Sequence, residues 1–277
     1  MPAVNHIFQL LAGLPLSWMQ RVGACLGWIV WLVSPRYRHT FTSNVKASGI
    51  PSHLARPAIA AAGMVVSELP WVWMRPHTQT LNNLVQFDGA QYFEEAMRAG
   101  KGVIIMSPHI GSWEIGAQAI AEKFGPEFGD MVVLFRPARK PWLESLVANA
   151  RTRPFLNSTP TTLSGVRTLM RTLRAGGYTA ILPDQVPPDG QGVWAPFWGQ
   201  PAYSMTLLPR LVQQTGAAVL LCWCERLPQG RFRVHFQPFT DPILADPKAT
   251  MTERVAAMNR AIEQLVRQHP EQYLWGY

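Results

Sequence analysis

The chain has 277 residues, 48% of them hydrophobic and 15% charged, and its formal net charge is +8 at pH 7. Its size suits one domain with a full core, and its charge suits nucleic acid, anionic lipid headgroups or an acidic protein partner. The sequence lacks a block of five or more Lys/Arg and any zinc-finger or RNP-like spacing, which disfavours nucleic acid, and three cysteines do not make a disulfide framework.

The amino terminus is strongly apolar. Residues 7–33 contain a single charged side chain, Arg21, and the basic segment 36–38 follows. The uninterrupted apolar run, residues 22–33, is shorter than the roughly 20 residues of a spanning helix, and the pattern of a cleaved signal peptide is missing. We expect two short helices, joined near Pro15, that lie in or dip into a membrane, with the following chain on the cytoplasmic side. A pair of ordinary core helices is the alternative.

After a helical stretch that ends near Arg75, apolar runs alternate with helical patterns. This alternation predicts an α/β fold: a single domain with a mixed, largely parallel sheet flanked by helices. RFRVHF, at 231–236, alternates basic and apolar residues, and we expect it to be an edge strand. The buried strands are predicted at 103–106, 131–135, 178–182 and 218–224, and the helices at about 112–123, 141–150, 164–174, 204–215 and 252–268.

Two features of these elements are open to a functional or a structural interpretation. Cys222 and Cys224 share one face of a predicted strand, but two thiols without further ligands make a poor zinc site, so we expect packing residues and no metal. Arg167, Arg171 and Arg174 line one face of the helix at 164–174. Such a face is usually only solvated, and its alternative role is to dock an acidic partner.

The strand at 103–106 runs into a segment with catalytic residue types. His109 and Glu114 would lie about 140° apart on a continuous helix. Pro108 and Gly111 favour a turn and Ser112 is a good N-cap, so His109 is expected on a loop and Glu114 in the first helical turn, folding back towards it. A carboxylate on one imidazole nitrogen would leave the other free to take a proton from a hydroxyl. By itself this spacing is weak, and a structural histidine is the alternative.

Other polar residues follow other predicted strands. Asp184 comes after the strand at 178–182, Arg136 after the strand at 131–135, and Arg151 and Arg153 after the next helix. Open α/β sheets bind ligands at the carboxyl ends of their strands, so these side chains are expected to share one crevice with His109. For an isolated arginine, plain solvation is the alternative.

Six segments strengthen this prediction: HIGSWEIG, FRP, the RTR that begins at Arg151, LPDQ, FWGQPAYS and PEQYLW. In this order they resemble the bacterial late acyltransferases of lipid A biosynthesis, the lauroyl and myristoyl transferase family. The resemblance covers nearly the whole chain. His-x4-Glu is shared with the wider glycerolipid acyltransferase superfamily, whereas PEQYLW points to the lipid A branch. A departure is Ser112, where many members have Asn.

The resemblance implies an inner-membrane enzyme, facing the cytoplasm, that transfers a fatty acyl chain from acyl carrier protein to a Kdo-bearing lipid A precursor without a cofactor. It implies His109 as general base, Glu114 as its orienting carboxylate, and Arg151 and Asp184 as essential polar residues, with Arg136 supporting the same crevice. The expected division is 1–40, membrane-associating helices, and 41–277, acyltransferase catalytic domain. The candidate residues for docking the carrier protein are Arg139, Lys140, Arg167, Arg171 and Arg174.

Several alternatives remain open. The acceptor could be a glycerophospholipid, an ornithine-type lipid or an aryl polyketide-like product, or the protein could be a noncatalytic lipid-binding relative or a hydrolase. The sequence contains no GxSxG elbow, which disfavours a serine acyl-enzyme, and no P-loop or GxGxxG, so nucleotides are not expected. The chain ends at Tyr277, where relatives usually continue with a basic tail.

Overall fold

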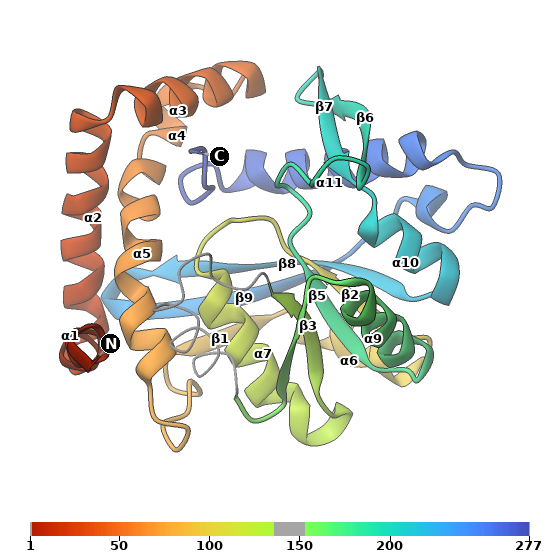
Figure 1. The fold of residues 1–277 in the computed structure, drawn as a ribbon, viewed down its shortest axis with the longest axis horizontal. Helices are drawn as coiled ribbons and strands as arrows, with labels where there is room; N and C mark the ends of the chain where they lie inside the picture. The colour runs from red at the N-terminus through yellow and green to blue at the C-terminus, as the bar shows by residue number, and fades with distance from the viewer. Residues whose placement is uncertain (1, 136–152, 277) are drawn as a thin grey trace.

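The computed structural model describes residues 2–135 and 153–276. A seven-stranded sheet in the order β1-β9-β8-β2-β5-β3-β4 forms its centre (Figure 1). Neighbouring strands run parallel except for β8 and β9, so within the described ranges the sheet is mixed and largely parallel, which confirms the predicted fold class. The strands are β1 (Val85–Asp88), β2 (Val103–Met106), β3 (Met131–Phe135), β4 (Leu156–Pro160), β5 (Tyr178–Ile181), β8 (Ala218–Leu227) and β9 (Arg231–Pro238).

The four apolar runs form the strands β2, β3, β5 and β8, as predicted. The prediction for 231–236 is wrong in one respect: β9 is not an edge strand, because β8 pairs on one side of it and β1 on the other. Its alternating pattern instead reflects burial of one of its two faces. The polar, four-residue β1 was not predicted, nor was β4 or the separate hairpin of β6 (Gly192–Phe197) and β7 (Gln200–Met205).

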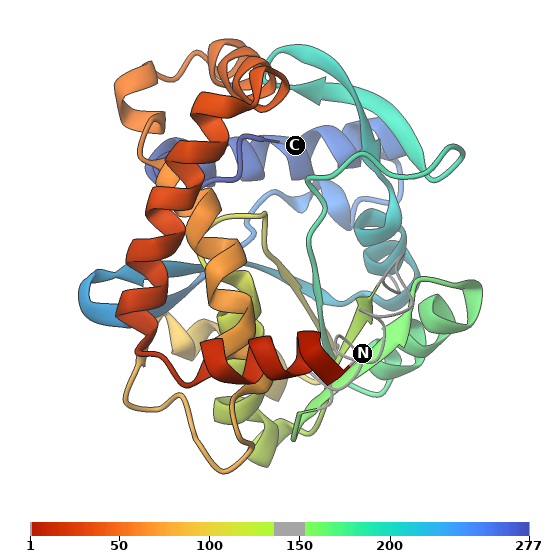
Figure 2. The same cartoon turned by 60° about the vertical axis from the view of Figure 1, so that its left-hand side comes forward.

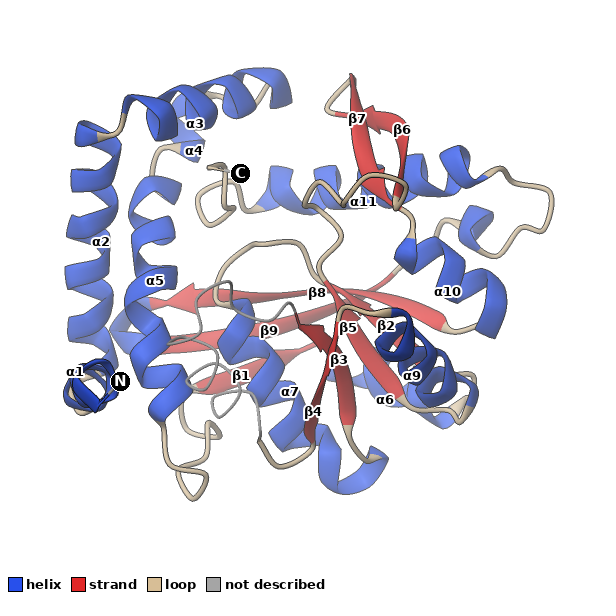
Figure 3. Cartoon of the chain, in the orientation of Figure 1, coloured by secondary structure: helices blue, strands red, loops and turns tan. Residues whose placement is uncertain are grey.

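Helices cover both faces of the sheet (Figure 3). In β2, Ile104 and Met106 belong to one buried cluster, while Val103 and Ile105 belong to the other. The alternation follows from the period of two in a strand. The helices α9 (Leu163–Arg174), α10 (Leu207–Thr215) and α11 (Met251–Gln268) contribute buried residues to the first cluster. The helices α6 (Ala90–Arg98) and α7 (Trp113–Phe128) contribute buried residues to the second. The helix predicted at 141–150 lies outside the described residues.

Two helices of the amino-terminal part, α2 and α5, lie side by side (Figure 2). They approach closely through glycines: a Cβ added to Gly63 would lie 2.0 Å from the Gly23 carbonyl oxygen. The predicted break near Pro15 separates the first two helices, and α3 runs across residue 40, where we placed a domain boundary. The five helices are α1 (Pro2–Ala12), α2 (Leu16–Val33), α3 (Pro35–Ser48), α4 (Ser52–Ala55) and α5 (Ala58–Met74).

The outer face of α2 is apolar and exposed. Trp18, Leu26 and Val33 are each about half exposed or more. By length and composition, Leu16–Val33 and Ser52–Met74 are both long and apolar enough to cross a membrane. Buried core helices pass the same test, and the finding agrees with a membrane-associated segment at the amino terminus.

Candidate active site

His109 lies on the loop between β2 and α7. The loop passes so close to β8 that a Cβ on Gly111 would lie 1.9 Å from the Cys224 carbonyl oxygen, and Gly111 has a φ of 63°. Only glycine tolerates this combination without strain. The Ser112 N–H donates to the same Cys224 carbonyl at 2.8 Å, and α7 begins at the next residue. The turn predicted from Pro108 and Gly111 therefore places His109 before the helix.

The carboxy-terminal segment holds the other side of this loop. Ile110 and Tyr273 form an antiparallel bridge. The Leu274 N–H donates to the His109 carbonyl at 2.9 Å, and the Gly111 N–H donates to the Gln272 carbonyl at 3.0 Å. These residues belong to the PEQYLW segment, which served in the sequence only as a family signature. In the structure it fixes the backbone on which the histidine stands.

Asp184 meets His109 from the neighbouring strand. It follows β5, which pairs in parallel with β2, so both residues stand at the carboxyl ends of adjacent strands. Its Oδ1 lies 2.7 Å from the His109 Nδ1, and its Oδ2 accepts the His109 backbone N–H at 2.8 Å. The two side chains are 2% and 10% exposed, respectively. The Asp184 carboxylate thus fixes both the ring and the backbone of the histidine.

This contact defines which imidazole nitrogen can act as a base. When Nδ1–H donates to Asp184, the Nε2 atom presents a lone pair. The Gln185 side-chain amide nitrogen lies 3.2 Å from Nε2 and can donate to it. The ring of Trp113 packs edge-on against the imidazole, with 4.9 Å between the centroids. Asp184, Gln185 and Trp113 therefore all contact the imidazole and together fix the orientation of its ring.

Tyr273 lies beside the same carboxylate. Burial raises the pKa of its phenol well above the usual value, and the charge of Asp184 and a hydrogen bond to it raise that pKa further. The phenol therefore stays protonated, and its hydroxyl hydrogen remains available to the carboxylate. The side chain of Tyr273 supports Asp184 while its backbone supports the His109 loop.

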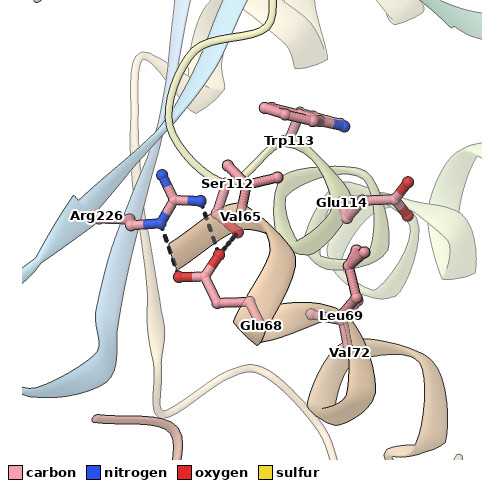
Figure 4. A pocket seen from close by; sticks show the side chains of 8 residues that line it. All are labelled: Val65, Glu68, Leu69, Val72, Ser112, Trp113, Glu114 and Arg226. Carbon is pink, nitrogen blue, oxygen red and sulfur yellow. Dashed lines mark hydrogen bonds and ion pairs between the residues drawn. The ribbon is translucent and has the colours of Figure 1, made fainter. Parts of the chain in front are cut away.

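Glu114 lies in the first turn of α7, as predicted. It lines a cavity of about 10 Å³ together with Glu68, Ser112, Trp113 and Arg226, and its carboxylate extends away from Arg226 (Figure 4). The carboxylate at Nδ1 of His109, where we expected Glu114, is that of Asp184. Asp184 is thus an orienting carboxylate in this structure, and the assignment of that role to Glu114 stays a prediction.

The remaining predicted residues fall into two groups. Arg136, Arg139, Lys140 and Arg151 lie outside the described residues. The arginine face predicted on α9 is present: Arg167, Arg171 and Arg174 are exposed on that helix, opposite its buried residues. Its role in docking a partner stays a prediction.

Arg153, the second arginine of the RTR segment, is buried and has a structural role. Its guanidinium donates to the Val72 carbonyl at 2.9 Å and to the Arg75 carbonyl at 2.6 Å, at the end of α5. Burial, helped by the nearby charge of Arg75 and opposed by that of Glu122, lowers the pKa of Arg153 to about 10. Arg75 forms an ion pair with Glu122. This cluster stabilises the junction of α5 and α7.

Cys222 and Cys224 are buried core residues, as predicted. Burial raises the pKa of both thiols, so neither is a thiolate at neutral pH. In the part of the chain that the structure describes, no group of three or more His, Cys, Asp or Glu side chains is arranged to hold a metal ion.

Two buried charges beside the site were missed in the sequence. Glu68, on α5, and Arg226, on β8, form an ion pair that also contacts Ser112. The available signal was the isolation of Glu68, which is the sole charged residue of Ala58–Met74. A lone carboxylate in an apolar helix predicts a buried partner, but the sequence does not say which of 25 Lys and Arg residues it is.

The fold and the site define an α/β protein with a histidine–aspartate pair at the carboxyl ends of adjacent parallel strands. The sequence profile of the bacterial lipid A biosynthesis acyltransferases matches residues 3–276, and the chain belongs to this family. This confirms the family resemblance found in the motifs.

Curated relatives carry the same description. The chain is 26% identical over 191 residues to a lipid A biosynthesis acyltransferase of Haemophilus influenzae, a match that covers 69% of this chain and 57% of the relative. It is 26% identical over 192 residues to lipid A biosynthesis acyltransferase 2 of Shigella flexneri, covering 69% and 59%. The lipid A biosynthesis lauroyltransferase of Escherichia coli K12 is 22% identical over 218 residues, covering 78% and 67%. The chain thus spans less than two thirds of the first two relatives.

Proposed function

We propose that this protein transfers a fatty acyl chain from an acyl carrier protein thioester to a hydroxyl of a Kdo-bearing lipid A precursor. The observation that carries the proposal is the His109–Asp184 contact at the carboxyl ends of adjacent parallel strands, in a member of this family. The reaction as proposed uses neither a metal ion nor a nucleotide.

In the proposed reaction the acceptor hydroxyl approaches Nε2 of His109 and displaces the amide of Gln185. Nε2 takes the hydroxyl proton while the oxygen attacks the thioester carbonyl, and Asp184 supports the imidazolium that forms. The tetrahedral intermediate collapses with cleavage of the C–S bond, and the imidazolium proton passes to the leaving pantetheine thiolate. Backbone N–H groups or Arg151 would stabilise the oxyanion, and Arg136 would support the same crevice.

The exposed apolar face of α2 supports the proposed location at the inner membrane. Arg36, just after this helix, is exposed, whereas Arg38 donates to the Trp31 and Leu32 carbonyls and closes the helix end. Apolar residues buried among acyl chains, with basic side chains at headgroup level, are typical of interfacial segments. By the positive-inside tendency, the basic residues favour the cytoplasmic face.

The basic face of α9 supports a carrier protein as the source of the acyl chain. Its Arg167, Arg171 and Arg174 are exposed and would complement an acidic partner. Arg139 and Lys140 are the further docking residues of this proposal. Because exposed charges are screened over about 10 Å at 0.1 M salt, binding of the carrier should weaken as the salt concentration rises.

Thiol release from acyl carrier protein thioester, measured with purified protein and lipid acceptor, tests the proposal. We expect release that depends on the acceptor, an acylated product by mass spectrometry, and loss of both in His109→Ala. Near-normal transfer by this variant would remove His109 as the base. Release without acceptor would indicate a hydrolase, transfer to another lipid would change the acceptor, and lipid binding without thioester consumption would indicate a noncatalytic protein.

A further inference from the structure

We infer that Glu68 is a positioning residue: its buried carboxylate, paired with Arg226, holds Ser112 and with it the loop that presents His109. The inference deepens the proposed function and rests on it. It assigns a role in the reaction to α5, which the sequence indicated only as part of an apolar helical stretch.

Four hydrogen bonds converge on the Glu68 carboxylate, and Figure 4 shows those from Arg226 and Ser112. Its Oε1 accepts from Nε of Arg226 at 2.7 Å and from the side-chain amide of Gln20 at 2.9 Å. Its Oε2 accepts from Nη2 of Arg226 and from the hydroxyl of Ser112, both at 2.8 Å. The Glu68 and Arg226 side chains are 2% and 6% exposed. A two-point arginine–carboxylate contact fixes direction as well as distance.

These contacts join four elements that are far apart in the chain. Gln20 comes from α2, Glu68 from α5, Ser112 from the start of α7 and Arg226 from β8. Well-packed apolar residues often match or exceed a buried ion pair in stability, so stability is a weak reason for placing one here. An apolar contact has no preferred direction, so it would fix the arrangement of these four elements less well than the ion pair and its hydrogen bonds do.

Ser112 links this ion pair to the catalytic histidine. It is the N-cap residue of α7, yet its side chain makes no cap hydrogen bond to that helix, and its hydroxyl donates to Glu68 instead. Ser112 is only three residues after His109, and the turn at Gly111 lies between them. A shift of the Ser112 end of the loop would therefore move the imidazole away from Asp184.

Arg226 reaches the same loop from the opposite side. Its backbone N–H donates to Oε1 of Gln272 at 2.8 Å, and its carbonyl accepts from Nε2 of Gln272 at 3.2 Å. The Gln272 carbonyl in turn accepts the Gly111 N–H. Among the residues that the structure describes, Nη1 of Arg226 is buried without a hydrogen-bond partner, so its charge relies on Glu68. Neutralising Glu68 would release both sides of the loop.

The space around the ion pair leaves little room for compensation. Glu68, Ser112 and Arg226 line the cavity of about 10 Å³ that also contacts Trp113 and Glu114. A cavity of that size holds about one water. A misplacement of about 1 Å at a catalytic group can cost about 10²-fold in rate. We therefore expect a change in kcat rather than in KM, because the ion pair is enclosed by protein.

The test uses the full chain in detergent, with thioester consumption and ¹⁵N-histidine NMR as readouts. Glu68→Gln keeps the side-chain shape, and we expect kcat about 10–100-fold lower with KM within about threefold. The Nδ1–H signal of His109, held by Asp184, should broaden or shift. The matched control is Glu122→Gln, which neutralises a carboxylate in the second half of α7 that is paired with the buried Arg75. It should leave kcat and the histidine signal unchanged.

A milder pair of variants guards against misfolding of Glu68→Gln. Ser112→Ala removes the hydroxyl alone, and we expect kcat about 3–10-fold lower. Ser112→Thr, which keeps a hydroxyl, should restore most of that loss. The double variant Glu68→Gln/Ser112→Ala should be no slower than Glu68→Gln alone, since both changes break one chain of contacts.

Two results would overturn the inference. One is a kcat within twofold of the wild type in Ser112→Ala and folded Glu68→Gln. The other is an equal loss in Glu122→Gln, which would mean general destabilisation. Failure of the proposed function gives a different pattern: the wild-type protein itself consumes no thioester, while the NMR signal of His109 still reports whether Glu68 positions the loop.

Discussion

The replacement Asp184→Asn separates the charge of the carboxylate from its shape. One oxygen of Asp184 contacts Nδ1 of His109 at 2.7 Å, and the other accepts the backbone N–H of the same residue at 2.8 Å. If the amide oxygen keeps the backbone contact, the NH₂ group faces Nδ1. The ring must then accept at Nδ1 and carry its proton on Nε2, which is the wrong tautomer for a base.

The expected magnitude follows from this geometry. General-base catalysis contributes about 10²–10⁴-fold, which corresponds to about 2.7–5.4 kcal/mol at 1.36 kcal/mol per tenfold. The Asp184 side chain is enclosed, so substrate binding should change little. We expect kcat to fall by about 10²–10⁴-fold with KM within about threefold.

The assay is thioester consumption under saturating acceptor, with circular dichroism to verify that each variant is folded. Asp189→Asn is the control, because Asp189 is an exposed acid five residues further along the same segment. Glu114→Gln in parallel shows which carboxylate supports the histidine. A folded Asp184→Asn variant with activity within about threefold of the wild type would refute the reasoning and return that role to Glu114.

Three further predictions follow from other contacts. Gln185→Leu removes the amide 3.2 Å from Nε2 of His109, and we expect kcat up to about tenfold lower at unchanged melting temperature; an unchanged kcat would make the contact incidental. Gly111→Ala should lower the free energy of unfolding by about 3–5 kcal/mol, whereas Gly100→Ala, with a similar φ but no atom near the added Cβ, should cost about 1 kcal/mol in chemical denaturation. Arg171→Glu should raise KM for the carrier protein and flatten its salt dependence, and unaffected steady-state kinetics at low salt would count against docking on α9.

The local patterns of the sequence predicted the elements with strong periodicity. Val103–Met106 and Met131–Phe135 are continuous apolar runs, and α11 shows an apolar stripe. Burial imposes such patterns directly on neighbouring residues. β1, with the sequence VQFD, is too short and too polar to leave a comparable signal. Because β1 left no sign in the sequence, β9 was wrongly predicted to be an edge strand, although β1 pairs with it.

Local sequence patterns were enough to place His109 between a strand and a helix, to place Asp184 at a strand end, and to indicate the family. The pairing of β2 with β5, which brings Asp184 to the imidazole across 75 positions of the chain, is visible only in the folded protein. The same is true of the contact between Glu68 and Arg226 across 158 positions. Periodicity records whether a side chain faces the core or the solvent. Which buried carboxylate meets which cation depends on strand order and helix packing, and those are properties of the whole chain.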